Sequence, residues 1–236
     1  MIKTKKILRL ISSKIWIKGL FHNIAANVEL ENLIKNLNFE TVFDIGSNKG
    51  QFTILIEGLY PNKVIYSFDP LIENIEKQKK FFKNSNNIFF YNYAISNNPE
   101  INKFYVTKRK DSSSFLKVKR FSNSDYKIVE ERKVIVKSIE EIYKITNFPK
   151  NILVKIDVQG YELNVLKSAK ACLRHIKYII IEVSDTKLYE DQALYQDVYS
   201  FLLENNFELK KENIPDKIKN TNILQKDVLF TNRLIK

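Results

Sequence analysis

The segment TVFDIGSNKG, residues 41–50, carries the clearest chemistry in this chain: an acidic residue at the end of an apolar run, followed by a glycine loop. The apolar run reads as a buried strand that ends at Asp44, and apolar residues recur at helical spacing after Gly50. Asn48 stands where a dinucleotide-binding loop carries its second glycine, so the loop is unsuited to a pyrophosphate. A carboxylate at the strand end favours a cationic ligand, and S-adenosylmethionine, with its sulfonium and ammonium groups, fits that description.

A second acidic residue ends the next apolar run. Residues 64–68 read as a strand, and Asp69 follows them about 20 residues beyond the glycine loop. An acid in this place accepts the hydroxyls of an adenosine ribose in related nucleotide-binding folds. Either motif alone is a common turn, but the two in register predict a site for a nucleoside cofactor.

The rest of the chain supplies the elements that must position these residues. We expect an N-terminal helical extension over residues 1–40, with a helix at 24–37, and one α/β domain over residues 41–236. A β-hairpin insertion over 97–136 is expected to lie over the cofactor, and a final antiparallel pair is expected to cross a loop at Pro215. The periodicity predicts strands at 41–44, 64–69, 88–95, 151–157, 178–183, 207–212 and 228–232, and helices at 51–59, 71–83, 161–173 and 192–205.

Composition narrows the class of protein. With 236 residues, 44% hydrophobic and 28% charged, the chain can bury a sizeable core. Its one cysteine, Cys172, excludes an intramolecular disulfide and is expected to be a buried thiol, while two histidines are too few for a zinc site. Because no run approaches the roughly 18 apolar residues of a membrane span, we expect a cytoplasmic protein.

The net charge of +12 attracts nucleic acid, anionic lipid or acidic glycans, and does not choose among them. Much of it lies in residues 1–20, where six basic residues occur and no acidic residue precedes Glu29. We expect a first helix that packs its apolar face on the protein and turns its basic side chains outward. Peripheral contact of residues 1–20 with an anionic membrane is the alternative.

The run LVKIDVQGYE at 153–162, together with FDIGSNKG at 43–50 and YSFDP at 66–70, resembles the FkbM family of S-adenosylmethionine-dependent methyltransferases. The resemblance extends over roughly residues 41 to 205. It implies the class I methyltransferase fold, a Rossmann-like α/β architecture. That fold has a seven-stranded, mostly parallel sheet with an antiparallel last strand and helices on both faces.

The resemblance also implies the roles of particular residues. Asp69 would hold the ribose, where the family usually has glutamate, and Ala94 in the turn at 92–94 would contact the adenine. Where the family often has Leu-Asp-Asp, this chain has Ile-Glu-Glu at 139–141, and we assign the two glutamates no role in the site. The residues expected to hold the methionine part or to complete the cofactor site are Asp44, Gly46, Asn48, Gly50, Gln51 and Phe52.

Methyl transfer to an alcohol needs a group that removes a proton held about as tightly as that of water, whose pKa is about 15.7. Asp157 ends the fourth predicted strand and Glu182 lies in the fifth, so both are expected at the carboxyl edge of the sheet. They are the predicted catalytic residues. With Asp185 they could instead hold Mg²⁺, which prefers oxygen ligands.

Three functions fit these observations. The first is an O-methyltransferase acting on a sugar hydroxyl in a surface polysaccharide, a glycolipid or a nucleotide-sugar precursor, with a phosphorylated or acidic glycan suiting the basic charge. The second is a nucleic-acid methyltransferase, which residues 157–160, DVQG, disfavour because amino-directed enzymes carry Asp/Asn-Pro-Pro-aromatic there. The third is a module that binds S-adenosylmethionine without catalysis. The sequence does not indicate an oligomeric state.

Overall fold

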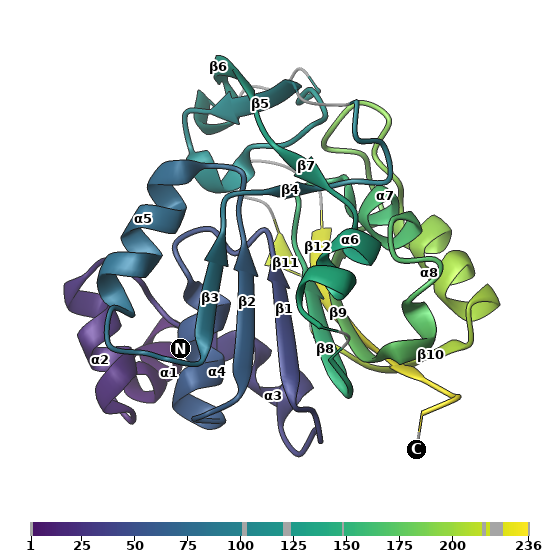
Figure 1. Cartoon of the computed structure of the whole chain (residues 1–236). Helices are drawn as coiled ribbons and strands as arrows, with labels where there is room; N and C mark the ends of the chain where they lie inside the picture. Colours follow the sequence, from purple (N-terminus) through teal and green to yellow (C-terminus); the bar gives the residue numbers. More distant parts are fainter. Residues whose placement is uncertain are drawn as a thin grey trace.

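A seven-strand path forms the centre of the molecule (Figure 1). The computed structural model describes residues 2–100, 103–119, 124–147, 149–213, 216–217 and 224–235, so the expected loop at Pro215 lies outside the described residues. The strands are β1 (Thr41–Ile45), β2 (Val64–Phe68), β3 (Ile88–Tyr91), β8 (Ile152–Ile156), β9 (Ile176–Ser184), β10 (Phe207–Glu212) and β12 (Leu224–Asn232). Their order is β10-β12-β9-β8-β1-β2-β3, and the short β11 (Asp216–Lys217) pairs with β12.

The strand directions confirm the expected fold class. Strands β1, β2, β3, β8 and β9 are parallel, and β12 runs antiparallel to both β9 and β10. The order reverses between β1 and β8, which is where ligands bind in open sheets of this kind. This register sets Asp44 beside Ser67 on one side and Lys155 on the other.

Helices cover both faces of the sheet (Figure 1). Side chains alternate along each strand, so Val42 and Leu153 enter one hydrophobic core while Phe43 and Val154 enter the other. On the first face lie α3 (Glu31–Ile34), α4 (Gln51–Leu59) and α5 (Ile72–Phe81); on the second lie α6 (Ile139–Ile145), α7 (Glu162–Lys167) and α8 (Tyr195–Glu204).

Several predicted elements are shorter than their apolar patterns. In place of a helix over 24–37, the chain has a 3-10 turn, η1 (Val28–Leu30), and then α3, which Asn36 ends by adopting a positive φ of 66°. The helix predicted over 161–173 is also shorter than expected, because α7 ends at Lys167. The strand expected over 88–95 divides at Asn92, whose side-chain amide donates to the carbonyl oxygen of Asp69.

The predicted insertion is present and lies above the carboxyl ends of the strands (Figure 1). Its antiparallel pair is β5 (Lys103–Thr107) and β6 (Ile128–Lys133), with the 3-10 turns η2 (Lys110–Ser112) and η3 (Ser124–Tyr126) between them. A second small sheet joins β4 (Ala94–Ile95) to β7 (Val136–Lys137) in parallel. Glu73 of α5 forms ion pairs with Lys110 and Arg132, and these pairs attach the insertion to α5.

The N-terminal segment forms two short helices, α1 (Ile2–Leu10) and α2 (Lys14–Phe21). Trp16 is fully buried beside α4 and donates from its indole N–H to the carbonyl oxygen of Ile54 at 2.9 Å. Within the part of the chain that the structure describes, no helix has the length and apolar character needed to cross a bilayer.

Candidate active site

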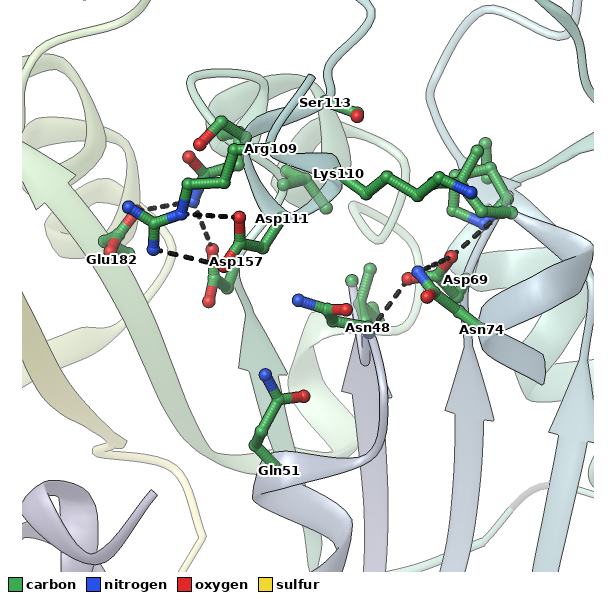
Figure 2. A pocket seen from close by; sticks show the side chains of 18 of the residues that line it. Asn48, Gln51, Asp69, Asn74, Arg109, Lys110, Asp111, Ser113, Asp157 and Glu182 are labelled. Atoms are coloured by element: carbon green, nitrogen blue, oxygen red, sulfur yellow. Dashed lines mark hydrogen bonds and ion pairs between the residues drawn. The ribbon is translucent and has the colours of Figure 1, made fainter. Parts of the chain in front are cut away.

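A cavity of about 510 Å³ opens at the carboxyl ends of β1, β2, β8 and β9. Its size falls within the range of roughly 300–1,000 Å³ that is usual for small-molecule sites. The insertion contributes its roof, where Arg109 and Asp111 lie above Asp157 (Figure 2). Five of the predicted cofactor-binding residues line this cavity: Gly46, Asn48, Gln51, Asp69 and Ala94.

Three other predicted cofactor residues do not line it. Phe52 is fully buried in the hydrophobic core under α4. Asp44 is buried within β1, where it accepts a hydrogen bond from the Thr53 hydroxyl at 2.8 Å, and burial raises its pKa. Gly50 lies beside Gln78 and is not part of the cavity lining. The predicted contacts of Asp44, Gly50 and Phe52 with the cofactor stay predictions.

The two loop glycines are required by the chain itself. Gly46 has a φ of +76°, and a Cβ there would fall 1.9 Å from the carbonyl oxygen of Asp157. Gly50 has a φ of +92°, and its Cβ would fall 3.2 Å from the Gln78 side chain. Left-handed backbone and close packing both demand glycine. Packing and backbone conformation therefore require glycine at both positions, and the predicted roles of Gly46 and Gly50 in cofactor binding stay predictions.

Asp69 holds the second wall together (Figure 2). Its Oδ2 accepts from the backbone N–H of Asn48 at 2.8 Å, and its Oδ1 accepts from the N–H of Leu71 at 2.9 Å and the Asn74 amide at 3.0 Å. Burial raises the pKa of Asp69 to about 7. A carboxylate has about four acceptor positions, so Oδ2 keeps capacity for one further donor.

The walls of the cavity fit S-adenosylmethionine. Among the described residues, two buried side-chain oxygens lack a partner, Oδ1 of Asp44 and Oδ1 of Asn48, and the second belongs to a residue of the cavity wall. An unpaired buried acceptor is costly, and an ammonium group would satisfy the Asn48 oxygen. The wall formed by Leu71, Tyr93 and Ile95 is apolar, which suits a purine ring.

The two predicted catalytic carboxyl groups face each other across one amide. Nε2 of Gln159 donates to Oδ1 of Asp157 at 2.7 Å and to Oε2 of Glu182 at 3.0 Å. Glu182 also accepts from the Gln225 amide at 3.0 Å. Burial, and then the negative charge of Asp157, raise the pKa of Glu182 well above its ordinary value. The structure thus brings both residues together in the cavity, as expected.

Lys155 forms an ion pair with Asp157. Its side chain is buried in β8, and Nζ lies 2.8 Å from Oδ2 of Asp157. Burial alone would lower the pKa of Lys155, but the charges of Asp157 and Asp44 raise it above its ordinary value. The ammonium group of Lys155 therefore stays charged and remains paired with the Asp157 carboxyl group.

The arrangement gives the predicted Mg²⁺ site no support. Asp185 is exposed and does not line the cavity, so it does not join Asp157 and Glu182. The Gln159 amide bridges those two carboxyl groups. Nowhere in the described ranges do three or more His, Cys, Asp or Glu side chains gather in a way that would hold a metal ion.

Sequence reasoning missed the residues that connect the roof to the acidic pair. Tyr189 is fully buried, and its hydroxyl lies 2.9 Å from the carbonyl oxygen of Ser112 in η2 and 3.1 Å from Oε1 of Gln159. Gln159 itself has a positive φ of 57°, which places its amide between the carboxyl groups. The run 153–162 marked the position of Gln159 but not its contacts.

Comparison with known proteins decides the family. The profile of the methyltransferase FkbM domain matches residues 44–209, more than half of the chain. The chain belongs to the FkbM methyltransferase family. It has the class I methyltransferase fold, and the predicted family and fold are confirmed.

Two known proteins illustrate the similarity. A 64-residue segment is 33% identical to the hexuronic acid methyltransferase AglP of Haloferax volcanii, and covers 26% of this chain and 27% of that protein. The match thus spans about a quarter of the relative's length. The structure of M. capricolum TrmK with S-adenosyl-homocysteine shares the fold, with a TM-score of 0.53, 14% identity, and coverage of 89% of this chain and 70% of that chain.

Glu162 gives a pH prediction. It lies in the first turn of α7, where Oε1 accepts from the N–H groups of Val158 and Gly160, and burial raises its pKa to about 7. A carboxyl whose folded pKa is raised contributes stability below its unfolded pKa near 4.5 and loses it as the pH rises through 7. Glu162→Gln removes this loss, on the order of 3 kcal/mol.

Urea unfolding at about pH 5 and about pH 8 measures the effect. The stability of Glu162→Gln relative to the wild type is expected to increase at the higher pH. The exposed Glu100→Gln serves as the control and is expected to show the same difference from the wild type at both values. If the difference in stability between Glu162→Gln and the wild type does not change with pH, the Glu162 carboxyl group has the same pKa in the folded and unfolded states, and the prediction is wrong.

Proposed function

We propose that this chain is an S-adenosylmethionine-dependent O-methyltransferase that acts on a hydroxyl group of a sugar. The observation that carries the proposal is the pair of carboxyl groups, Asp157 and Glu182, held together by Gln159 in the cavity that also contains the cofactor-binding loop. A base beside the cofactor is what alcohol methylation requires, because the acceptor hydroxyl must lose its proton.

The residues divide the work as follows. When bound, S-adenosylmethionine supplies a methyl group on a positively charged sulfur. Asn48 and Asp69 would hold its amino and ribose groups. Asp157, which is paired with Lys155, would take the proton of the acceptor hydroxyl, while Gln159 and Glu182 fix the position of Asp157. Holding the acceptor in line with the methyl group is the larger part of the rate gain in such displacements.

A carbohydrate acceptor is supported by the character of the cavity. Carboxyl and amide groups of Asp157, Glu182, Gln159 and Gln225 line it, and such groups pair well with sugar hydroxyls. The relative AglP bears the name of a hexuronic acid methyltransferase, which agrees with a sugar acceptor.

Charge argues for an uncharged acceptor over an acidic one. The three basic residues of the cavity lining are each in an ion pair: Arg109 with Asp111, Lys110 with Glu73, and Lys226 with Glu212. A carboxylate or phosphate of the acceptor would have to displace one of these partners. The same lining disfavours nucleic acid, because it contains the carboxyl groups of Glu29, Asp69, Asp111, Asp157, Glu182 and Asp227.

Transfer of labelled methyl groups tests the proposal. The purified chain is incubated with methyl-labelled S-adenosylmethionine and either neutral polysaccharides, acidic polysaccharides, or bulk RNA and DNA. More label is expected in the neutral than in the acidic polysaccharides, and hydrolysis should release O-methyl sugars. Label in nucleic acid alone would contradict the proposal in favour of a nucleic-acid methyltransferase. Cofactor binding without transfer to any acceptor would favour a non-catalytic module.

The unpaired oxygen of Asn48 gives a prediction on affinity. Asn48 has a positive φ of 50°, so Asn48→Gly keeps the backbone and removes only the amide. Loss of a hydrogen bond to an ammonium group is expected to weaken S-adenosylmethionine binding about ten- to hundredfold, measured by isothermal titration. Asn62→Gly, at an exposed position with a φ of 74°, is the matched control and should bind as the wild type does. Equal affinities for both variants would remove Asn48 from the cofactor site.

A further inference from the structure

In the first helix, α1, charged side chains face the protein and apolar side chains are exposed. Lys6 forms an ion pair with Glu29 at 2.9 Å, and Arg9 pairs with Glu31 and lies over the Trp16 ring at 5.0 Å. Lys6 and Arg9 of α1 thus contact the protein. The expectation of a basic outer surface over an inward apolar face is wrong for this helix.

Leu10 of α1 is buried, but apolar side chains at the end of this helix and just after it face solvent. Ile7, Leu8 and Ile11 are 59%, 60% and 53% exposed. At about 100° per residue, Ile7 and Leu8 lie on the side of α1 that faces away from Lys6 and Arg9 taken together, and Ile11 directly follows the helix. A surface helix usually buries its apolar side chains against the protein. Their exposure here indicates a site of interaction with a membrane or another molecule.

The second helix also exposes an apolar side chain, together with positive charge. Phe21 is 84% exposed, and at helical spacing it shares one side of α2 with Lys14 and Lys18, which are also exposed. Residues 1–22 contain six basic residues and no acidic ones. Apolar side chains flanked by lysines fit an anionic lipid surface, where apolar groups enter the acyl boundary and lysines meet phosphates.

We propose that α1 and α2 form a docking surface for an anionic lipid bilayer, with Ile7, Leu8, Ile11 and Phe21 inserted and Lys14 and Lys18 at the headgroups. Glu29 both pairs with Lys6 and lines the cavity, so the lipid-facing helix is joined directly to the cavity wall. The proposal concerns binding alone and does not depend on the acceptor proposed above.

Co-sedimentation of the full chain with extruded vesicles tests it. The vesicles are phosphatidylcholine alone or an equal mixture of phosphatidylcholine and phosphatidylglycerol. Binding is expected to be at least about tenfold stronger to the anionic vesicles and to fall with added salt. The triple variant Ile7→Ser, Leu8→Ser, Ile11→Ser and the double variant Lys14→Glu, Lys18→Glu should each lose this binding.

A matched control separates insertion from general stickiness. The variant Ile135→Ser, Ile145→Ser removes two apolar side chains that are 58% and 54% exposed elsewhere, and it should bind as the wild type does. Unchanged thermal unfolding of each variant shows that the fold is kept. Binding that survives the triple serine variant would overturn the proposal. Absence of vesicle binding would also overturn the proposal. If sedimentation equilibrium then shows a dimer that the triple serine variant abolishes, the exposed apolar residues form an interface between two copies of the chain.

Discussion

Asp157→Asn is expected to lower kcat by about 10²- to 10⁴-fold, the usual contribution of a general base. Asp157 lines the cavity and forms an ion pair with Lys155 at 2.8 Å, and it is the carboxyl group that we propose as the base. Asparagine keeps the shape of the side chain and removes the charge. Because Asp157 lies apart from the Asn48 and Asp69 wall, the affinity for S-adenosylmethionine should change little.

Two measurements distinguish loss of the base from loss of structure. Isothermal titration reports cofactor affinity, and thermal unfolding reports whether the buried Lys155, deprived of its partner, weakens the fold. Glu182→Gln is the comparison, because it keeps an oxygen for the Gln159 and Gln225 amides and leaves the Lys155–Asp157 pair intact. We expect it to retain more activity than Asp157→Asn. Full activity of Asp157→Asn would make Asp157 a structural residue.

Gly46→Ala is expected to destabilise the protein by about 4 kcal/mol or more. The new Cβ would lie 1.9 Å from the carbonyl oxygen of Asp157, a backbone atom that cannot move without shifting the end of β8. The φ of +76° adds about 1–2 kcal/mol of left-handed strain for alanine. Any folded fraction should also lose activity, because the clash displaces the residue proposed as the base.

Gly50→Ala separates these two causes. It carries the same left-handed strain at a φ of +92°, but its Cβ meets only the flexible Gln78 side chain, at 3.2 Å. Urea unfolding should therefore show a loss of only about 1–2 kcal/mol for Gly50→Ala. Equal losses for the two variants would show that backbone strain alone, and not contact with Asp157, requires glycine at position 46.

The sequence predicted the parts of the site that depend on strand ends. Parallel strands share one carboxyl edge, so Asp69, Asp157 and Glu182 were expected to meet, and they line one cavity. Asp44 shows the limit of this reasoning. It lies inside β1 beside Lys155, one residue short of the strand end, and a pattern of residue types does not reveal whether such a side chain reaches the ligand.

Features that arise from tertiary contacts escaped prediction. The apolar spacing of residues 24–37 indicates a helix, yet Leu30, Leu33 and Ile34 reach the core from a 3-10 turn and a single α-helical turn. The bridge from Ser112 through Tyr189 to Gln159 joins residues far apart in the chain. The outward apolar side of α1 is set by Glu29 and Glu31 on another element, which helical spacing alone does not show.

The most direct test of the account is isothermal titration of the purified chain with S-adenosylmethionine and S-adenosylhomocysteine. The account predicts one site per chain for each, with dissociation constants in the micromolar range, and weaker binding by Asn48→Gly than by Asn62→Gly. Wild-type protein that is folded and yet releases no heat with either compound would contradict it, because the cavity at the ends of β1 and β2 would then not be the cofactor site.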